Sequence, residues 1–422
     1  MELRTARRPY FSTHMKSNFD RRLVTILAIV FVNIVGAAMI LPVLPLYALE
    51  ELHLREQVIT LVIASYFVAQ FLAGPILGRY SDRNGRVPVL IVSQIGTIIS
   101  FIMMGLANNV WMLLAARVLD GITGGNIIVA QAYLTDVTPK KERTQALGYI
   151  FAVFGLGFII GPALGGLLSA EFGRRIPFYM AAAIAGITTL MTWRLLEESL
   201  TPDQMKSSRE TRSKSLTPVQ LLRNAPLIQI LIVSFIAQFG LGLVRSSLAL
   251  FGNAVLFAGE PQDVILRHVG LLFTTIGTTQ FLVQTLLLKR FIRWFGEGLM
   301  VVFGNLIRTG GNLLFAVAIT PLYGYLAAVL FPFGQGTMMP PLQAMATQTV
   351  EDELRGGVLG VYQSILNLAI IAGTALSGSL FAASPALPFW IATALGLAAV
   401  IPTLSLLRGH KRALEETYPA EA

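Results

Sequence analysis

The chain has 422 residues, a net charge of +9 and no cysteine, and only 13% of its residues are charged. Its mean hydropathy is +0.67. Soluble domains carry about 25% charged residues, so the composition excludes an ordinary soluble globule and predicts an integral membrane protein. Without cysteine, disulfides and thiol chemistry are also excluded.

Twelve apolar runs are long enough to cross a bilayer as helices, and they are too long and too continuous for barrel strands. They begin near Leu23, Val58, Val87, Val110, Thr144, Ile176, Leu227, Val264, Leu299, Leu322, Gly356 and Leu387. The predicted fold is an all-α membrane protein with twelve transmembrane helices in two pseudo-symmetric six-helix bundles. The expected parts are a tail (1–22), a first bundle (23–196), a polar linker (197–225), a second bundle (226–408) and a tail (409–422).

The positive charges predict an orientation. Lys and Arg are favoured in cytoplasmic loops. If the N-terminus is cytoplasmic and successive loops lie on alternate sides of the membrane, 25 of the 32 Lys and Arg residues lie inside, four lie outside and three lie within the spans. Both termini are therefore expected in the cytoplasm of a cell membrane protein, and the basic excess needs no nucleic acid to explain it. The four histidines are expected in tails or loops: His14, His53, His268 and His410.

A charged turn, "GRYSDRNGR" (Gly78–Arg86), separates the second and third runs. Asn84-Gly85 is a turn signal because both residues tolerate positive φ. Asp82 can accept hydrogen bonds from Arg83 or Arg86, or face the N-terminus of a neighbouring helix. The turn is interpreted as a conformational latch, with a solvated topology anchor as the alternative.

The fourth run carries Arg117 and Asp120, and Asp120 is the only carboxylate expected within a span. It lies about 15 Å from the start of its helix, near the middle of the membrane. A spacing of three residues puts both side chains on one helical face, where they can pair. An apolar cavity favours the protonated carboxyl, whereas the guanidinium favours the ionised form. We interpret the pair as a proton-coupling site; a static ion pair and direct substrate contact remain alternatives.

The fifth run contains "GLGFIIGPALGG" (Gly155–Gly166), in which Gly157, Gly161 and Gly165 recur every four residues. This spacing leaves one helical face bare and predicts close approach of another helix. Pro162 removes one backbone hydrogen bond and permits a bend, and Gly166 extends the motif.

Two further arginines, Arg245 and Arg308, are expected within spans of the second half. With Arg117 they outnumber the single acid, which favours an anionic, zwitterionic or metal-chelating substrate, unless backbone groups satisfy them. Polar residues in other spans complete the candidate substrate contacts, each with helix–helix hydrogen bonding as the alternative: Asn33, Tyr66, Gln70, Asn126, Gln335, Gln363 and Asn367.

An internal repeat relates the two halves. "QAYLTDVTPKKERTQALG" (Gln131–Gly148) resembles "QAMATQTVEDELRGGVLG" (Gln343–Gly360), and "GPALGGLL" (Gly161–Leu168) matches "GTALSGSL" (Gly373–Leu380) at the same offset of 212 residues. Two parallel repeats are typical of secondary transporters, in which the substrate site lies between the halves.

These motifs resemble the twelve-helix drug:proton antiporters of the major facilitator superfamily, including tetracycline exporters. The resemblance rests on "GRYSDRNGR", "RVLDGITGG" (Arg117–Gly125) and "GLGFIIGPALGG", and on "MILPVLPLY" (Met39–Tyr47) at the end of the first helix. It implies that Gly78, Asp82, Arg83, Gly85 and Arg86 form a latch that meets the start of helix 11, near Arg355–Val358. The chain differs from its relatives at two positions, with Asn33 in place of an acid and Asp120 where Gln is frequent.

The predicted function is proton-coupled efflux of amphiphilic small molecules or drugs by alternating access. The alternatives are a lipid or glycolipid flippase and an exporter of an anionic metabolite. An enzyme or an ATP-driven pump is disfavoured, because the sequence contains no HExxH, G-x-S-x-G or G-x-x-x-x-G-K-[ST] motif. No cofactor or metal is expected. The expected partners are substrate, protons and the lipid bilayer, and the expected state is a monomer.

Overall fold

The computed structural model describes residues 13–124, 126–139, 143–201, 205, 224–351 and 354–407. The predicted C-terminal tail and most of the predicted linker lie outside these ranges. The helices of the first half are α1 (Thr13–Glu50), α2 (Glu56–Asn84), α3 (Arg86–Leu106), α4 (Val110–Thr123), α5 (Asn126–Val137), α6 (Arg143–Phe172) and α7 (Ile176–Leu195). One predicted span is therefore built from two helices, α4 and α5.

The second half has the α-helices α10 (Ala225–Phe251), α11 (Gln262–Leu282), α12 (Leu288–Ala316), α13 (Pro321–Gln348), α14 (Arg355–Ala383) and α15 (Leu387–Ala398). Two short π-helical segments, η1 (Gly252–Leu256) and η2 (Val283–Leu287), follow α10 and α11. The described residues form no strand, which agrees with the all-α prediction.

Ten segments of the described chain are long and apolar enough to cross a membrane. One of them, Gln262–Ala316, has 55 residues and would be roughly 80 Å long as a straight helix, far more than a bilayer core. Gly296 interrupts it with φ 75° and ψ 163°, so the segment provides two spans. The 28-residue helix α13 completes the twelve predicted spans.

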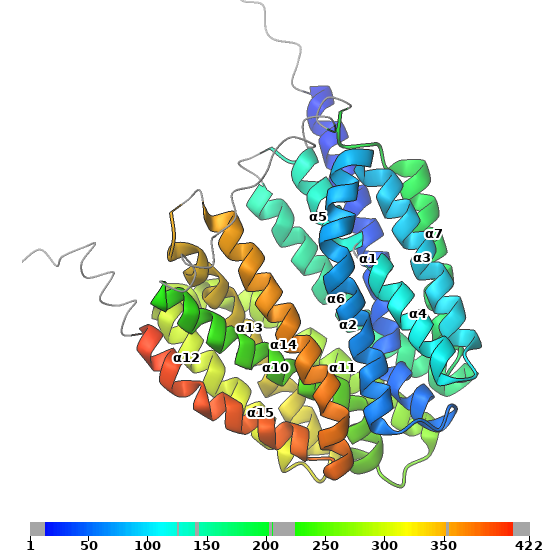
Figure 1. The fold of residues 1–422 in the computed structure, drawn as a ribbon, viewed down its shortest axis with the longest axis vertical. Helices are drawn as coiled ribbons and strands as arrows, with labels where there is room; N and C mark the ends of the chain where they lie inside the picture. Colours follow the sequence, from blue (N-terminus) through cyan, green and yellow to red (C-terminus); the bar gives the residue numbers. More distant parts are fainter. Residues whose placement is uncertain are drawn as a thin grey trace, which may run out of the picture.

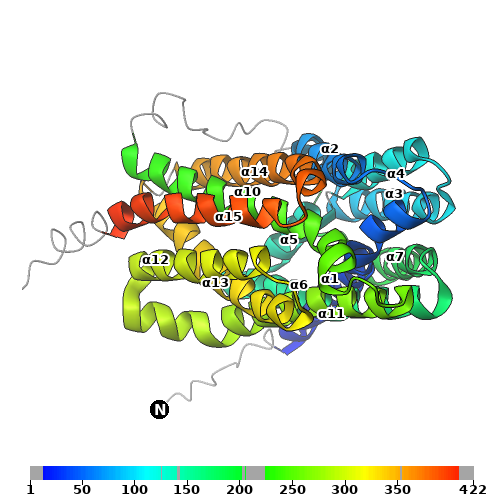
Figure 2. The same cartoon turned by 90° about the horizontal axis from the view of Figure 1, so that it is seen from below.

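Helices α1–α7 and α10–α15 form two groups that meet at one end and diverge at the other (Figure 1). The view from below shows α14 of the second half lying alongside α2 of the first half (Figure 2). We call the end with the α1–α2 connection the outer end, and the end with the α2–α3 turn the inner end, after the orientation predicted from charge. The predicted bundle boundaries stay a prediction.

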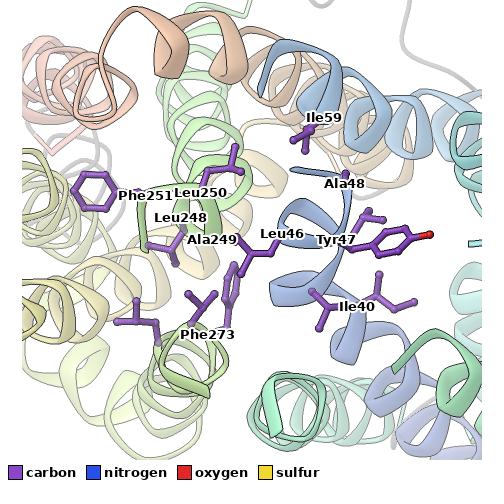
Figure 3. Packing of buried hydrophobic residues seen from close by; sticks show 14 of the residues in the cluster. Ile40, Leu46, Tyr47, Ala48, Ile59, Leu248, Ala249, Leu250, Phe251 and Phe273 are labelled. Atoms are coloured by element: carbon purple, nitrogen blue, oxygen red, sulfur yellow. The ribbon is translucent and has the colours of Figure 1, made fainter. Parts of the chain in front are cut away.

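The halves contact each other near the outer end. A Cβ on Gly270 of α11 would lie 3.0 Å from the Cα of Gly166 on α6, so the two helices touch through their backbones. The backbone N–H of Gly378 on α14 donates to Thr60 Oγ1 of α2 at 3.1 Å. Between these contacts, apolar side chains of α1, α10 and α11 point toward one another, as Figure 3 shows for Leu46, Ala249 and Phe273.

Two details differ from the sequence prediction. Helix α1 begins at Thr13, within the predicted tail, because hydropathy marks the apolar run and not the polar helical turns before it. His268 lies on α11, and not in a loop, with Nδ1 3.0 Å from the hydroxyl of Tyr325.

Candidate functional site

A cavity of about 230 Å³ lies between the halves, lined by residues of α1, α2, α3, α4, α5, α6, α10 and α14. Five of the predicted site residues on its wall come from the first half: Asn33, Tyr66, Gln70, Arg117 and Asp120. Arg245 joins them from the second half. The cavity is therefore shared between the halves, as alternating access requires.

Arg117 and Asp120 form an ion pair on the cavity wall. Arg117 Nη1 donates to Asp120 Oδ2 at 2.8 Å, and both side chains are buried. The Arg117 guanidinium also lies over the ring of Tyr66, 4.4 Å from its centroid, a cation–π contact. The carboxylate is thus paired, as the cost of burying a charge requires, and it also borders the cavity.

The span that carries Asp120 is interrupted just after it. Helix α4 ends at Thr123 and α5 begins at Asn126. The Gly124 carbonyl accepts a hydrogen bond from Gln70 Nε2 at 3.1 Å, and the same nitrogen donates to the Tyr66 hydroxyl at 3.1 Å. Both N–H donors of the Gln70 amide are therefore used within the protein.

Arg245 is the second cation of the cavity. Its guanidinium lies 5.2 Å from the ring centroid of Phe158 on α6, and it forms no ion pair with any described residue. With Asp120 ionised, the wall carries two positive charges and one negative charge. The excess of positive charge predicted from the sequence is therefore present in the cavity itself.

Much of the remaining wall was not predicted. It includes Phe101 of α3, Phe154 and Phe158 of α6, Ile370 of α14, and the hydroxyl groups of Thr97, Ser246 and Thr374. Apolar walls with a few polar groups are typical of sites for amphiphilic small molecules. The periodicity of the sequence could have placed these residues on common helical faces, but not shown which face borders the cavity.

Several predicted substrate contacts lie elsewhere. Arg308 is buried in the second half, where Nη1 donates to the Ala237 carbonyl at 2.9 Å. Gln335 donates to Gln238 at 3.0 Å. Neither lines the cavity; both satisfy helix–helix hydrogen bonds, the alternative that the sequence left open. Gln363 and Asn367 are exposed on α14 and are also absent from the cavity wall. The side chain of Asn126 lies outside the described residues.

The charged turn contains the predicted turn glycine, since Gly85 has φ +96°. Arg86 is buried and binds Asp82 at 2.5 Å and Asp136 of α5 at 2.9 Å. Arg83 is exposed, and a Cβ on Gly78 would meet nothing within 4 Å. Within the described residues no ion pair or hydrogen bond joins Asp82 to α14, so the predicted contact is not made in this conformation.

Glu198 is a participant in this turn that the sequence reasoning missed. Its carboxylate accepts hydrogen bonds from the backbone N–H groups of Arg86 at 2.9 Å and Val87 at 3.1 Å, and so caps the N-terminus of α3. The sequence places an acid after the sixth span, but it gives no sign of a partner 111 residues earlier.

The glycine motif packs α6 on two partners. Cβ atoms on Gly157, Gly161 and Gly165 would collide with α1, at Ile34, Ala38 and Met39 respectively. Gly166 faces Gly270 of α11, across the junction between the halves. Close helix approach, predicted from the glycine spacing, is therefore found both within the first half and between the halves.

Comparison with known proteins agrees with this architecture. A model of the Major Facilitator Superfamily matches residues 26–259 and 246–422. The chain belongs to this family, which is a family of transporters and not a class of enzymes, and it is a multi-pass membrane protein.

Two curated relatives resemble the chain over nearly its whole length. The chain is 31% identical to "Tetracycline resistance protein, class C" of Escherichia coli, over 93% of this chain and 98% of the relative. It is 30% identical to "Multidrug resistance protein 1" of Bacillus subtilis (strain 168), over 90% of this chain and 95% of the relative. Among solved structures, the human organic anion transporter MFSD10 (TETRAN) superposes with a TM-score of 0.67 at 21% identity, covering 91% of this chain and 99% of that one. This last likeness concerns the fold alone.

Proposed function

We propose that the protein is a secondary active transporter that exports amphiphilic small molecules or drugs in exchange for protons. The names of the tetracycline and multidrug resistance relatives, which this chain matches over nearly its whole length, support drug efflux. The observation that carries the proton coupling is the Arg117–Asp120 pair, a buried carboxylate on the wall of a cavity shared by both halves.

The sign of the coupling follows from the charges of the cavity. When Asp120 is ionised, it offers an acceptor to a cationic or hydrogen-bond-donating group of the substrate. When it is protonated, its negative charge is lost, one of its oxygens becomes a hydrogen-bond donor, and the net charge of the Arg117, Asp120 and Arg245 group rises by one. Binding of a proton therefore weakens binding of a cationic or hydrogen-bond-donating substrate, and the reverse, as antiport requires. An anionic substrate would bind better to the protonated cavity, which disfavours the alternative of an anion exporter.

Alternating access would use the contacts at the two ends of the molecule. In this conformation the halves touch at the outer end and diverge at the inner end, which suits substrate entry from the cytoplasm. We propose that the opposite state closes the inner end by bringing the charged turn (Gly78, Asp82, Arg83, Gly85 and Arg86) to the start of α14. The Gly166–Gly270 contact would then open.

The proposed setting is the cell membrane, with both termini in the cytoplasm and the monomer as the working unit. The positive charges at the inner end support this orientation. A lipid flippase on the same fold is not favoured by the relatives, but it can be tested in the same preparation.

The test is proton flux in liposomes that contain the purified protein, an imposed pH gradient and an internal pH dye. Adding lipophilic drugs should increase proton flux above that of protein-free liposomes, which control for passive movement of weak bases. Labelled lipid should stay in its original leaflet. Lipid movement without drug-induced proton flux would contradict the proposal and favour the flippase.

A further inference from the structure

The interruption between α4 and α5 leaves backbone groups that need partners. The last carbonyls of a helix have no N–H donor within the helix. Backbone groups left without a hydrogen bond are costly at membrane depth. At this break the Gly124 carbonyl receives its hydrogen bond from the side chain of Gln70, on the neighbouring helix α2, at 3.1 Å. Gln70 therefore supports the interrupted span at the level of Asp120.

The Gln70 amide also connects the break to the Arg117–Asp120 ion pair, through Tyr66. Gln70 Nε2 donates to the Tyr66 hydroxyl at 3.1 Å. The ring of Tyr66 lies against the Arg117 guanidinium, 4.4 Å from centroid to carbon, and Arg117 pairs with Asp120 at 2.8 Å. An unbroken series of contacts thus runs from the helix break, through α2, and back to the carboxylate on α4.

The space at Gly124 shows how tightly this series is packed. A Cβ at this position would lie 2.9 Å from the Asp120 carbonyl oxygen, 3.1 Å from the Tyr66 hydroxyl and 3.3 Å from Gln70 Nε2. The glycine therefore leaves room for both side chains at the break, whereas a side chain at position 124 would crowd the Tyr66 hydroxyl and the Gln70 amide.

We propose that Gln70 is a positioning residue for the proton-coupling site, acting through Tyr66 on the Arg117–Asp120 pair. The inference rests on the proposed proton coupling, and it gives Gln70 a different role from the substrate contact predicted from the sequence. With the amide in place, the Tyr66 ring stays against Arg117 and holds the guanidinium toward Asp120. Without it, the ring can turn away and the ion pair loosens.

Gln70→Leu tests this role by removing both hydrogen bonds at similar volume. Since the guanidinium favours the ionised carboxyl, the pH at which substrate-induced proton release is half-maximal should move upward by at least about half a unit. Substrate affinity, measured at a pH where Asp120 is fully ionised, should change by less than about threefold. Tyr66→Phe, which keeps the ring and removes only the hydroxyl, should give a smaller shift in the same direction.

Gln238→Leu is the matched control, because it breaks a glutamine pair with Gln335 in the second half and should leave the midpoint unchanged. A tenfold loss of affinity in Gln70→Leu with an unchanged midpoint would overturn the inference and make Gln70 a substrate contact. If Gln70→Leu fails to fold, an unshifted midpoint in Tyr66→Phe overturns it as well. Absence of substrate-induced proton release in the unmodified protein would instead refute the proposed function.

Discussion

The two halves each bury an arginine within the membrane, yet they use it differently. In the first half, Arg117 pairs with Asp120 on the wall of the central cavity. In the second half, Arg308 is 1% exposed, has no ion pair with a described residue, and donates to the Ala237 carbonyl. An embedded arginine is therefore not by itself evidence of a transport site. What distinguishes Arg117 is a titratable partner and a position on the cavity.

The largest expected effect separates these two arginines. Arg117→Met leaves Asp120 buried without its cation, so efflux driven by a pH gradient should fall at least about tenfold. Arg308→Met replaces a guanidinium that touches only protein with a side chain of similar length, so efflux should stay within about twofold. Initial rates in liposomes at equal protein content provide the measurement. Similar losses in both variants would remove the distinction between the halves.

A smaller effect on transport is expected from a substitution in the outer contact between the halves, which has no counterpart among the described residues at the inner end in this conformation. Gly270→Ala places a Cβ 2.7 Å from the Pro162 carbonyl oxygen, and backbone cannot move aside easily. The clash should destabilise the outer contact by roughly 1–3 kcal/mol and shift the protein toward the state that is closed inside. Gly310→Ala, which meets nothing within 4 Å, is the matched control.

The shift can be followed by labelling, since the chain has no native cysteine. A single Gln363→Cys substitution on α14 provides an exposed probe. Its reaction with a membrane-impermeant thiol reagent from the inner side should slow about fivefold in Gly270→Ala, equivalent to about 1 kcal/mol, and stay unchanged in Gly310→Ala. Equal rates in both variants would show that the glycine contact does not favour this conformation.

Much of the fold could be predicted from the sequence, because bilayer thickness sets the length of each spanning helix and Lys and Arg mark the loops on the cytoplasmic side. The run that begins at Val110 was correctly recognised as a span, and Asn84-Gly85 as a turn with φ +96° at the glycine. Asp120 and Arg117 were paired by their spacing alone, since three residues bring side chains onto one helical face.

The rest depended on tertiary contacts that periodicity does not contain. Arg245 and Arg308 look alike in the sequence, but one faces the cavity and the other a helix interface. Glu198 caps α3 through contacts more than 100 residues apart in the chain. The break after Thr123 was also missed: Gly124-Gly125 is a turn signal, but the apolar residues on both sides were assigned to one span, and the compensating amide of Gln70 comes from another helix.

The most direct test of the central claim is Asp120→Asn, which keeps the shape of the side chain and removes its charge and its titration. Uphill efflux driven by a pH gradient should fall to the level of protein-free liposomes, and substrate binding should become independent of pH, at the affinity of the protonated site, because the amide cannot ionise. Uphill efflux at the unmodified rate in a correctly folded Asp120→Asn protein would contradict the assignment of proton coupling to this carboxylate.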